Sequence, residues 1–370
     1  MKLSKPITIV CILLIIMSLL PTKGHAIAAN GAILMEQHSG RVLYEKNAHT
    51  PMRIASITKI MTAILAVESG KLDDFVKVSN KAAHTEGSSL YLQPNEKVKL
   101  LDLTYGLMLR SGNDSAVAIA EHVGGSLPKF VQMMNDKAKE LGMKQTVFAN
   151  PHGLDDHENH YSSAYDMALL TKYAMKNDTF AKIFGTKEYT YTSHDGVTKS
   201  WINKNRLLTQ FYEYCTGGKT GYTKRAKRTL VTTATKDDLD LIAVTINDRN
   251  DWNDHMTLYN RAFDQYDSVE IILKNKLAKI NDQYYKGKIL TRDSFQYPMT
   301  DEEKKHISLK INLKDPLTLD DNYNIKNPIG HINIFVKDLS IGEVPLYLTD
   351  LPKEDDTDKG FWQKLKKKFS

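Results

Sequence analysis

Three short strings of residues in this sequence carry side chains that can do chemistry together. In chain order they are Ser56-Ile57-Thr58-Lys59, Ser111-Gly112-Asn113 and Lys219-Thr220-Gly221. A hydroxyl, an amine and an amide in this combination are typical of serine acyl transfer, in which a lysine activates a serine nucleophile. Each string alone is a weak signal, whereas the ordered set of three indicates one active site.

The first string predicts how the nucleophile is activated. Ser56 and Lys59 are three positions apart, so on a helix their side chains share one face. A lysine acts as a base only when its amine is neutral, and burial together with nearby positive charge lowers its pKa. We expect Lys219 to supply that charge.

The other strings predict how the substrate is held. A helix N-terminus offers N–H groups to a developing oxyanion, and the strand that carries the third string can add another. Gly221 would let substrate backbone approach this strand, while Lys219 and Thr220 would attract a carboxylate. Ser111 would relay a proton to the leaving amine, and Asn113 would hold the acyl amide. The implied substrate is an acyl donor that ends in a free carboxylate.

A second match to the first string shows why one string is insufficient. Ser126-Leu127-Pro128-Lys129 has the same pattern, but two glycines precede it and a proline lies inside it. These neighbours favour a loop and a helix start, where Ser126 would cap the helix and Lys129 would be solvated.

Hydrophobic periodicity predicts the elements that position the three strings. Helical spacing over 55–68 indicates a buried helix that begins with the first string, and the second string separates two further helices. We predict helices at 101–110, 114–123, 127–141, 163–174 and 251–263. Strand patterns, including a hairpin near the start, occur at 32–35, 41–45, 189–192, 219–223, 229–235 and 239–247. The resulting α+β fold has a sheet formed from both ends of the domain, with helices inserted between them.

The end of the chain has a different pattern. Short apolar runs without a convincing helix predict a small all-β domain, with strands in the runs 269–273, 284–290, 307–313, 332–336 and 344–348. A polar linker follows, and Phe361, Trp362, Leu365 and Phe369 then fall on one side of a lysine-rich helix. That composition is typical of an interfacial helix on anionic lipid, the alternative being a frayed, solvated tail.

The first 26 residues are typical of an export signal. Two early lysines precede an apolar run over 7–20, and Gly24-His25-Ala26 provides small residues for cleavage. An uncleaved anchor is the alternative, although the run is short for a membrane span. Cleavage would lower the net charge from +6 to about +3, and no basic face in the main body indicates nucleic-acid binding.

Two further features invite functional interpretations that we do not favour. Cys215 lies close to Lys219, but a free cysteine is more often a small buried residue than a reactive thiol. His152, His157, Glu158 and His160 cluster in a Gly- and Asp-rich segment without metal-site spacing. We expect a loop that borders the site, and neither a metal nor a cofactor.

The motifs resemble those of the serine-type D-alanyl-D-alanine carboxypeptidases, which are low-molecular-mass penicillin-binding proteins, and most closely the forms of spore-forming Gram-positive bacteria. The resemblance covers about 30–265 densely and lies in the stretches 54–64, 86–89, 105–121, 151–154, 161–169 and 217–223. It implies a penicillin-binding/β-lactamase-like transpeptidase fold. It also implies a signal peptide at 1–26, a peptidase domain at 27–267, a β-rich domain at 268–351 and a membrane-associating end at 352–370.

The resemblance also implies a reaction and residue roles. Ser56 would form the acyl-enzyme, Lys59 would be its general base and Ser111 a proton relay, while Asn113 and Lys219-Thr220-Gly221 would bind substrate. The backbone N–H groups of Ser56 and Tyr222 would form the oxyanion hole. The reaction would remove the terminal D-alanine from peptidoglycan stem pentapeptides outside the cytoplasmic membrane, and β-lactams would acylate the same serine.

Two residues depart from the family pattern. Tyr222 stands where many relatives have histidine, which leaves its side-chain role open. Arg249 is the candidate for an arginine that binds the substrate carboxylate after the strand ending near Asn247.

Two other functions compete with this interpretation. A serine β-lactamase needs fast deacylation, and no Glu-x-x-Leu-Asn string lies between Ser111 and Lys219 to supply the deacylating glutamate. A non-catalytic penicillin-binding or wall-sensing module would usually connect to a signalling segment, which the sequence after residue 265 lacks.

Overall fold

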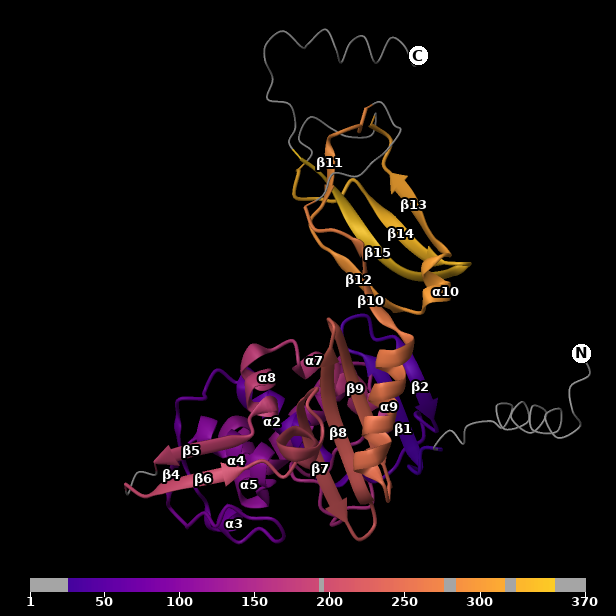
Figure 1. The fold of residues 1–370 in the computed structure, drawn as a ribbon. Coiled ribbons are helices and arrows are strands. Elements are labelled where there is room, and N and C mark those ends of the chain that lie inside the picture. The colour runs from indigo at the N-terminus through magenta and orange to yellow at the C-terminus, as the bar shows by residue number, and fades with distance from the viewer. Residues whose placement is uncertain (1–25, 193–195, 276–283, 317–323, 350–370) are drawn as a thin grey trace, which may run out of the picture. The chain divides into compact units, whose positions relative to one another are not determined.

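The computed structural model describes residues 26–192, 196–275, 284–316 and 324–349 (Figure 1). The predicted export signal and membrane-associating tail fall almost entirely outside these ranges. Contacts divide the chain into two compact units, the first with residues 44–233 and 242–260 and the second with the chain from 261 onward. Residues up to 34 join the first unit, and two hairpin tips, 35–43 and 234–241, group with the second. The expected boundary at 267 stays a prediction.

A five-stranded sheet is formed by strands from both ends of the peptidase part. Its order is β2-β1-β9-β8-β7, with β1 Gly31–Glu36, β2 Val42–Lys46, β7 Cys215–Thr223, β8 Lys227–Lys236 and β9 Leu239–Ile246. Helix α9 (Asp251–Gln265) lies along this sheet in Figure 1. Its buried His255 is within hydrogen-bond distance of Thr232 on β8 (2.7 Å) and Thr245 on β9 (3.1 Å). The mixed fold class and the sheet's assembly are therefore as predicted.

The helices between β2 and β7 surround one buried helix. A 3₁₀ turn (η1, Ala55–Thr58) leads into α2 (Lys59–Glu68), in which every residue from Lys59 to Val67 is buried. The helices packed around it are α4 Leu100–Arg110, α5 Asn113–Gly124, α6 Leu127–Glu140, α7 Ala164–Ala174 and α8 Asp178–Gly185. Helix α2 is thus buried on all sides, which explains its lack of charged residues after Lys59 until Glu68.

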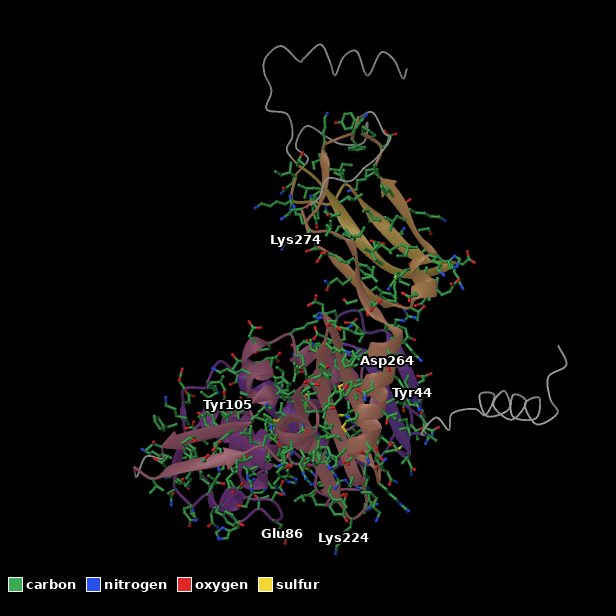
Figure 2. All side chains as sticks on the ribbon, in the orientation of Figure 1. Tyr44, Glu86, Tyr105, Lys224, Asp264 and Lys274 are labelled. Atoms are coloured by element: carbon green, nitrogen blue, oxygen red, sulfur yellow. The ribbon has the colours of Figure 1, made fainter. Side chains whose placement is uncertain are left out.

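Several short elements were missed by the periodicity argument. They are β3 Phe75–Lys77 with β4 Lys97–Lys99, α3 Asn80–Ala83, the α8 helix named above, β6 Thr198–Ile202 beside the predicted β5 (Glu188–Thr192), and a π-helical turn at Leu207–Phe211. Elements of three to five residues are too short for a hydrophobic period to be seen, and the eight residues of α8 cover only about two helical turns. The β5–β6 hairpin is held instead by aromatic packing, as in the stacked rings of Tyr189 and Tyr105 at 3.6 Å (Tyr105 is labelled in Figure 2).

The Ser126 string is a helix cap, as predicted. The Ser126 hydroxyl accepts a hydrogen bond from the Lys129 backbone N–H at the start of α6, and proline stands within its first turn. The Ser126 side chain therefore caps the helix, and Lys129 is exposed.

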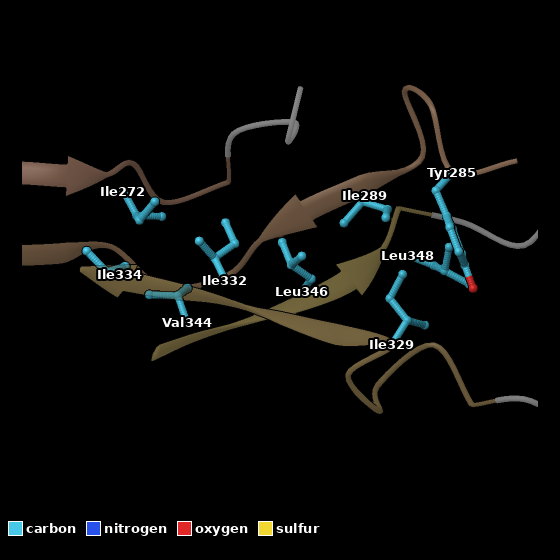
Figure 3. Packing of buried hydrophobic residues seen from close by; sticks show 9 residues of the cluster. All are labelled: Ile272, Tyr285, Ile289, Ile329, Ile332, Ile334, Val344, Leu346 and Leu348. Carbon is cyan, nitrogen blue, oxygen red and sulfur yellow. The ribbon is translucent and has the colours of Figure 1, made fainter. Parts of the chain in front are cut away.

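The C-terminal unit is built mainly from strands. Strands β10 (Asp267–Ile272) and β12 (Phe295–Met299) pair, and a four-stranded sheet has the order β11-β15-β14-β13, with β11 Ile289–Thr291, β13 Ile307–Leu313, β14 Gly330–Val336 and β15 Leu339–Leu348. Figure 3 shows the buried residues that these elements enclose, namely Ile272, Tyr285, Ile289, Ile329, Ile332, Ile334, Val344, Leu346 and Leu348. A single helical turn, α10 (Asp301–Lys304), was not expected and is stabilised by a capping box. No helix in the described ranges is both long and apolar enough to cross a membrane.

Candidate active site

Ser56 and Lys59 meet at the start of the buried helix. Ser56 is half-buried within the 3₁₀ turn, and Lys59, the first residue of α2, is fully buried. The Lys59 Nζ atom lies 3.0 Å from Ser56 Oγ. The predicted pairing through a three-residue spacing is present, although on a tighter helical turn than expected.

The Lys59 amine has two further oxygen partners. It donates to Asn113 Oδ1 (2.7 Å) and to the backbone carbonyl of His152 (2.6 Å). Burial lowers the pKa of Lys59 well below its usual value, and the positive charges of Lys219 and Lys204 lower it further. The site therefore favours the neutral amine, which is the form that accepts a proton.

Lys219 occupies the other side of the site. Its Nζ atom donates to Ser111 Oγ (3.0 Å) and to the carbonyl of Thr220 (2.7 Å), and the side chain is buried. Burial and the charge of Lys204 lower the pKa of Lys219 to about 7. Ser111 ends α4 in a left-handed conformation, with φ +66°. This conformation is rare for serine and is consistent with a functional constraint.

Asn113 is the first residue of α5, and both the oxygen and the nitrogen of its side-chain amide form hydrogen bonds. Its Oδ1 accepts from Lys59, its Nδ2 donates to the Glu86 carbonyl (2.6 Å), and its backbone N–H donates to the Ser88 carbonyl (2.6 Å). Glu86 is labelled in Figure 2. Asn113 thus connects the lysine to the segment that precedes β4.

Strand β7 lies against the turn that holds Ser56. A Cβ atom at Gly221 would come within 2.9 Å of the Ser56 backbone nitrogen and 2.3 Å of Thr229 Oγ1, so this approach requires glycine. Thr220 is half-buried beside it. Tyr222, the next residue of β7, is 63% exposed.

Arg249 is not brought into contact with these residues. It follows β9 and lines a separate hollow of about 490 Å³ together with Arg206, Arg228 and Trp252. Within the described residues, no hydrogen bond joins Arg249 to Lys219 or Thr220.

The loop at 151–160 borders the site through its backbone. The His152 carbonyl accepts from Lys59, and a Cβ atom at Gly153, whose φ is +85°, would lie only 1.9 Å from the Ala55 carbonyl oxygen. Burial lowers the pKa of His152 to about 3 and that of His160 to about 4, so both rings are neutral. Nδ1 of His160 accepts from the Ala149 N–H, and its Nε2 lies 2.8 Å from the Thr58 hydroxyl.

The structure also describes the remaining candidate groups. Cys215 is buried, and burial raises the pKa of its thiol to about 11, so it is a packed and unreactive side chain as predicted. No group of three or more metal-ligating side chains occurs in the part of the chain that the structure describes.

Comparison with known proteins decides the family. Residues 20–250 match the family model described as D-alanyl-D-alanine carboxypeptidase. The chain belongs to the D-alanyl-D-alanine carboxypeptidase family. Residues 266–353 match the model of the C-terminal domain of penicillin-binding protein 5, which confirms the predicted second domain.

Individual relatives agree with this assignment. D-alanyl-D-alanine carboxypeptidase DacF of Bacillus subtilis is 38% identical over 308 residues, covering 78% of each chain. DacC of Escherichia coli is 36% identical over 260 residues, covering 66% of this chain and 63% of the relative. The solved structure of penicillin-binding protein 5 from Haemophilus influenzae has a TM-score of 0.74 at 28% identity, covering 89% of this chain and 98% of that one. The chain is therefore a carboxypeptidase, and the expected likeness to enzymes of spore-forming Gram-positive bacteria is confirmed.

Gly153 provides a test of how tightly the site is packed. In Gly153→Ala, the new Cβ would displace the Ala55 carbonyl next to Ser56, adding about 1–3 kcal/mol of overpacking to the cost of a left-handed alanine. Gly142→Ala is the matched control, because Gly142 has φ +73° with nothing within 4 Å and loses only roughly 1–2 kcal/mol. Urea unfolding and the rate of labelling by fluorescent penicillin measure both effects. Equal stability and equal labelling in the two variants would contradict this packing argument.

Proposed function

We propose that Ser56 is the nucleophile with which this carboxypeptidase removes the terminal D-alanine from peptidoglycan stem pentapeptides. The observation that carries the proposal is the 3.0 Å approach of Ser56 Oγ to the buried amine of Lys59. A neutral amine has two N–H groups and one lone pair. Asn113 and His152 accept the two N–H groups, so the lone pair is left for the proton of the Ser56 hydroxyl.

The reaction then proceeds through an acyl-enzyme. Lys59 takes the Ser56 proton as Oγ attacks the carbonyl carbon of the penultimate D-alanine, and the backbone N–H groups of Ser56 and Tyr222 bind the oxyanion. Ser111, hydrogen-bonded to Lys219, passes its proton to the departing amine as the peptide bond breaks and regains one from protonated Lys59, which leaves Lys59 neutral again. Lys59 then takes a proton from water as the water oxygen attacks the ester carbonyl, and returns it to Ser56 Oγ as the ester bond breaks.

The substrate carboxylate is held on the Lys219 side of the site. Lys219 and Thr220 would attract it, and Gly221 would let substrate backbone lie along β7. Penicillins carry a carboxylate next to an acylating ring and would acylate Ser56 in the same manner. Arg249 lines a separate hollow, so it would bind the substrate carboxylate only if its side chain moved toward Lys219 when substrate binds.

The two competing functions are less well supported. The absence of a Glu-x-x-Leu-Asn string between Ser111 and Lys219 argues against rapid penicillin hydrolysis, and the match to a penicillin-binding protein C-terminal domain argues in the same direction. The match of residues 20–250 to the carboxypeptidase family model argues against a module that only binds.

We further propose that the enzyme acts outside the cytoplasmic membrane, either attached by its C-terminal tail or released into the wall. The support is the signal-like sequence at 1–26 and the aromatic and lysine-rich composition of 360–370.

The assignment of Ser56 as nucleophile is tested by measuring D-alanine release and the mass of the protein after reaction with penicillin. Wild-type protein is expected to release D-alanine from a pentapeptide and to gain the mass of one penicillin on the peptide that contains Ser56. Ser56→Ala should lose both activities, whereas Ser126→Ala, the matched control, should keep both. Adduct formation at another serine, or rapid penicillin turnover without an adduct, would overturn the proposal.

The two lysines predict a bell-shaped pH dependence of penicillin acylation. The rate should rise as Lys59 loses its proton and fall above about pH 7 as Lys219, whose pKa is lowered to about 7, loses the charge that attracts the carboxylate. Stopped-flow labelling from pH 5 to 10 measures this profile. In Lys219→Arg the falling limb should shift upward, because arginine stays charged. A wild-type rate that keeps rising through pH 9 would contradict the role of Lys219.

Membrane attachment is tested with vesicles. Protein that begins at residue 27 should cosediment with vesicles rich in anionic lipid, less so at high salt, and should remain soluble when residues 352–370 are removed. Replacing the tail lysines by glutamine, with the aromatic residues kept, is the control for charge. Protein that begins at residue 27, keeps its tail and still stays in the supernatant would refute the attachment.

A further inference from the structure

We propose that Thr58 and His160 are positioning residues that aim the backbone N–H of Ser56 into the oxyanion hole. This inference rests on the proposed function, in which that N–H binds the oxyanion formed during acyl transfer. Neither side chain has a part in the proposed acyl transfer itself, yet both are buried and connected to the turn that holds Ser56.

Three hydrogen bonds in series connect a loop backbone with the turn that holds Ser56. Nδ1 of His160 accepts from the Ala149 N–H (3.0 Å), and its Nε2 atom lies 2.8 Å from Thr58 Oγ1. Thr58 Oγ1 in turn donates to the Ala55 carbonyl oxygen at 2.8 Å. His160 and Thr58 are only 2% and 0% exposed, so solvent does not compete for these hydrogen bonds.

The two ends of the series determine the direction of every hydrogen bond in it. A backbone N–H can only donate, so Nδ1 of His160 carries no proton, and the proton of the neutral ring is on Nε2. A carbonyl can only accept, so the Thr58 hydroxyl gives its proton to Ala55 and accepts from His160. Burial and the charge of Arg53 lower the pKa of His160 to about 4, so the ring is neutral near pH 7.

The carbonyl at the end of the series belongs to the peptide unit that also contains the Ser56 N–H. The peptide bond between Ala55 and Ser56 is trans. In a planar trans peptide unit the C=O and the N–H point in opposite directions. Holding the Ala55 carbonyl therefore fixes the direction of the Ser56 N–H.

Contacts on the two sides of this peptide unit agree with that direction. A Cβ atom at Gly153 would lie 1.9 Å from the Ala55 carbonyl oxygen, whereas one at Gly221 would lie 2.9 Å from the Ser56 nitrogen. The carbonyl thus faces Gly153, and the N–H faces β7. This strand also carries Tyr222, whose backbone N–H is the second donor of the proposed oxyanion hole.

The peptide unit needs such support because its backbone is strained. Ala55 has φ +49°, a left-handed conformation that is rare for alanine. A conformation of this kind persists only where the surrounding contacts hold it. The hydrogen bond from Thr58 is one of these contacts, and His160 holds the Thr58 hydroxyl in the orientation that makes it. Without the hydroxyl, the peptide unit would turn and carry the Ser56 N–H out of line.

The test compares two replacements of Thr58. Thr58→Val keeps the shape of the side chain without its hydroxyl, and Thr58→Ser keeps the hydroxyl without the methyl group. Stopped-flow acylation over a range of penicillin concentrations separates the acylation rate constant from the binding constant. Removing an oxyanion donor outright costs about a hundredfold or more, so misdirecting one in Thr58→Val should lower the acylation rate constant roughly tenfold, with the binding constant unchanged. Thr58→Ser should keep most of the wild-type rate.

A role in packing alone predicts the opposite order of the two variants, because valine fills the site and serine leaves a void. A second readout depends on the oxyanion hole directly. A peptide boronic acid forms a tetrahedral adduct with a serine, and its affinity should fall in Thr58→Val by the same factor as the acylation rate constant.

Replacements of His160 test the other end of the series. His160→Phe keeps a ring but cannot donate to Thr58, and it should lower the acylation rate constant by less than Thr58→Val does. His160→Gln, which still offers an N–H to Thr58, should restore most of that loss. Adding His160→Phe to Thr58→Val should cause no further loss, because the two residues act in series. The two His160 variants decide the question if Thr58→Val does not fold.

The control is Thr171→Val, which removes another buried threonine hydroxyl, on α7, that donates to the Met167 carbonyl (2.7 Å). It should leave both acylation constants unchanged, and urea unfolding of each variant measures the change in stability separately. An unchanged rate constant in Thr58→Val, an equal loss in Thr58→Ser, or a loss confined to the binding constant would overturn the inference. Failure of wild-type protein to release D-alanine from a pentapeptide would instead overturn the proposed function.

Discussion

The burial of a lysine amine beside a serine is the constraint on which the rest of the peptidase domain depends. A charged amine taken from water into a protein interior costs several kcal/mol, so Lys59 is stable there mainly in its neutral form. Neutral Lys59 needs acceptors for two N–H groups, and these come from residues far apart in the chain, Asn113 and His152. The domain must therefore bring a helix start and a loop to one point around α2.

Close backbone approaches make that convergence possible. Gly153 lets the loop at 151–160 touch the Ala55 carbonyl, and Gly221 lets β7 reach the Ser56 backbone. Asp114 then holds the segment before β4 against the start of α5. The two glycine contacts bring backbone close to the turn that holds Ser56, so the geometry of the site is set by the packing of main chain as much as by side chains.

The sequence predicted the side chains of the site better than the surfaces around it. Ser56, Lys59, Ser111 and Lys219 carry recognisable spacing, and the long helices and strands that hold them have clear hydrophobic periods. The roles of the His152 carbonyl and of Gly153 lie in backbone contacts, which leave no side-chain pattern to read. Arg249 was assigned from its distance along the chain alone, and its loop directs it to a different hollow. Short elements such as β6 form through aromatic pairing across the chain, which a local period does not reveal.

The two buried lysines show how one physical effect serves opposite purposes. Burial lowers the pKa of both, and the charge of Lys219 lowers the pKa of Lys59 further, but their partners differ. Lys59 faces acceptors that satisfy a neutral amine and leave its lone pair toward Ser56. Lys219 faces the Ser111 hydroxyl and a carbonyl at the edge of β7, where an arriving carboxylate would restore its charge. In the proposed mechanism, the substrate carboxylate keeps Lys219 protonated, and that positive charge keeps Lys59 neutral, so the substrate helps to prepare the base that activates Ser56.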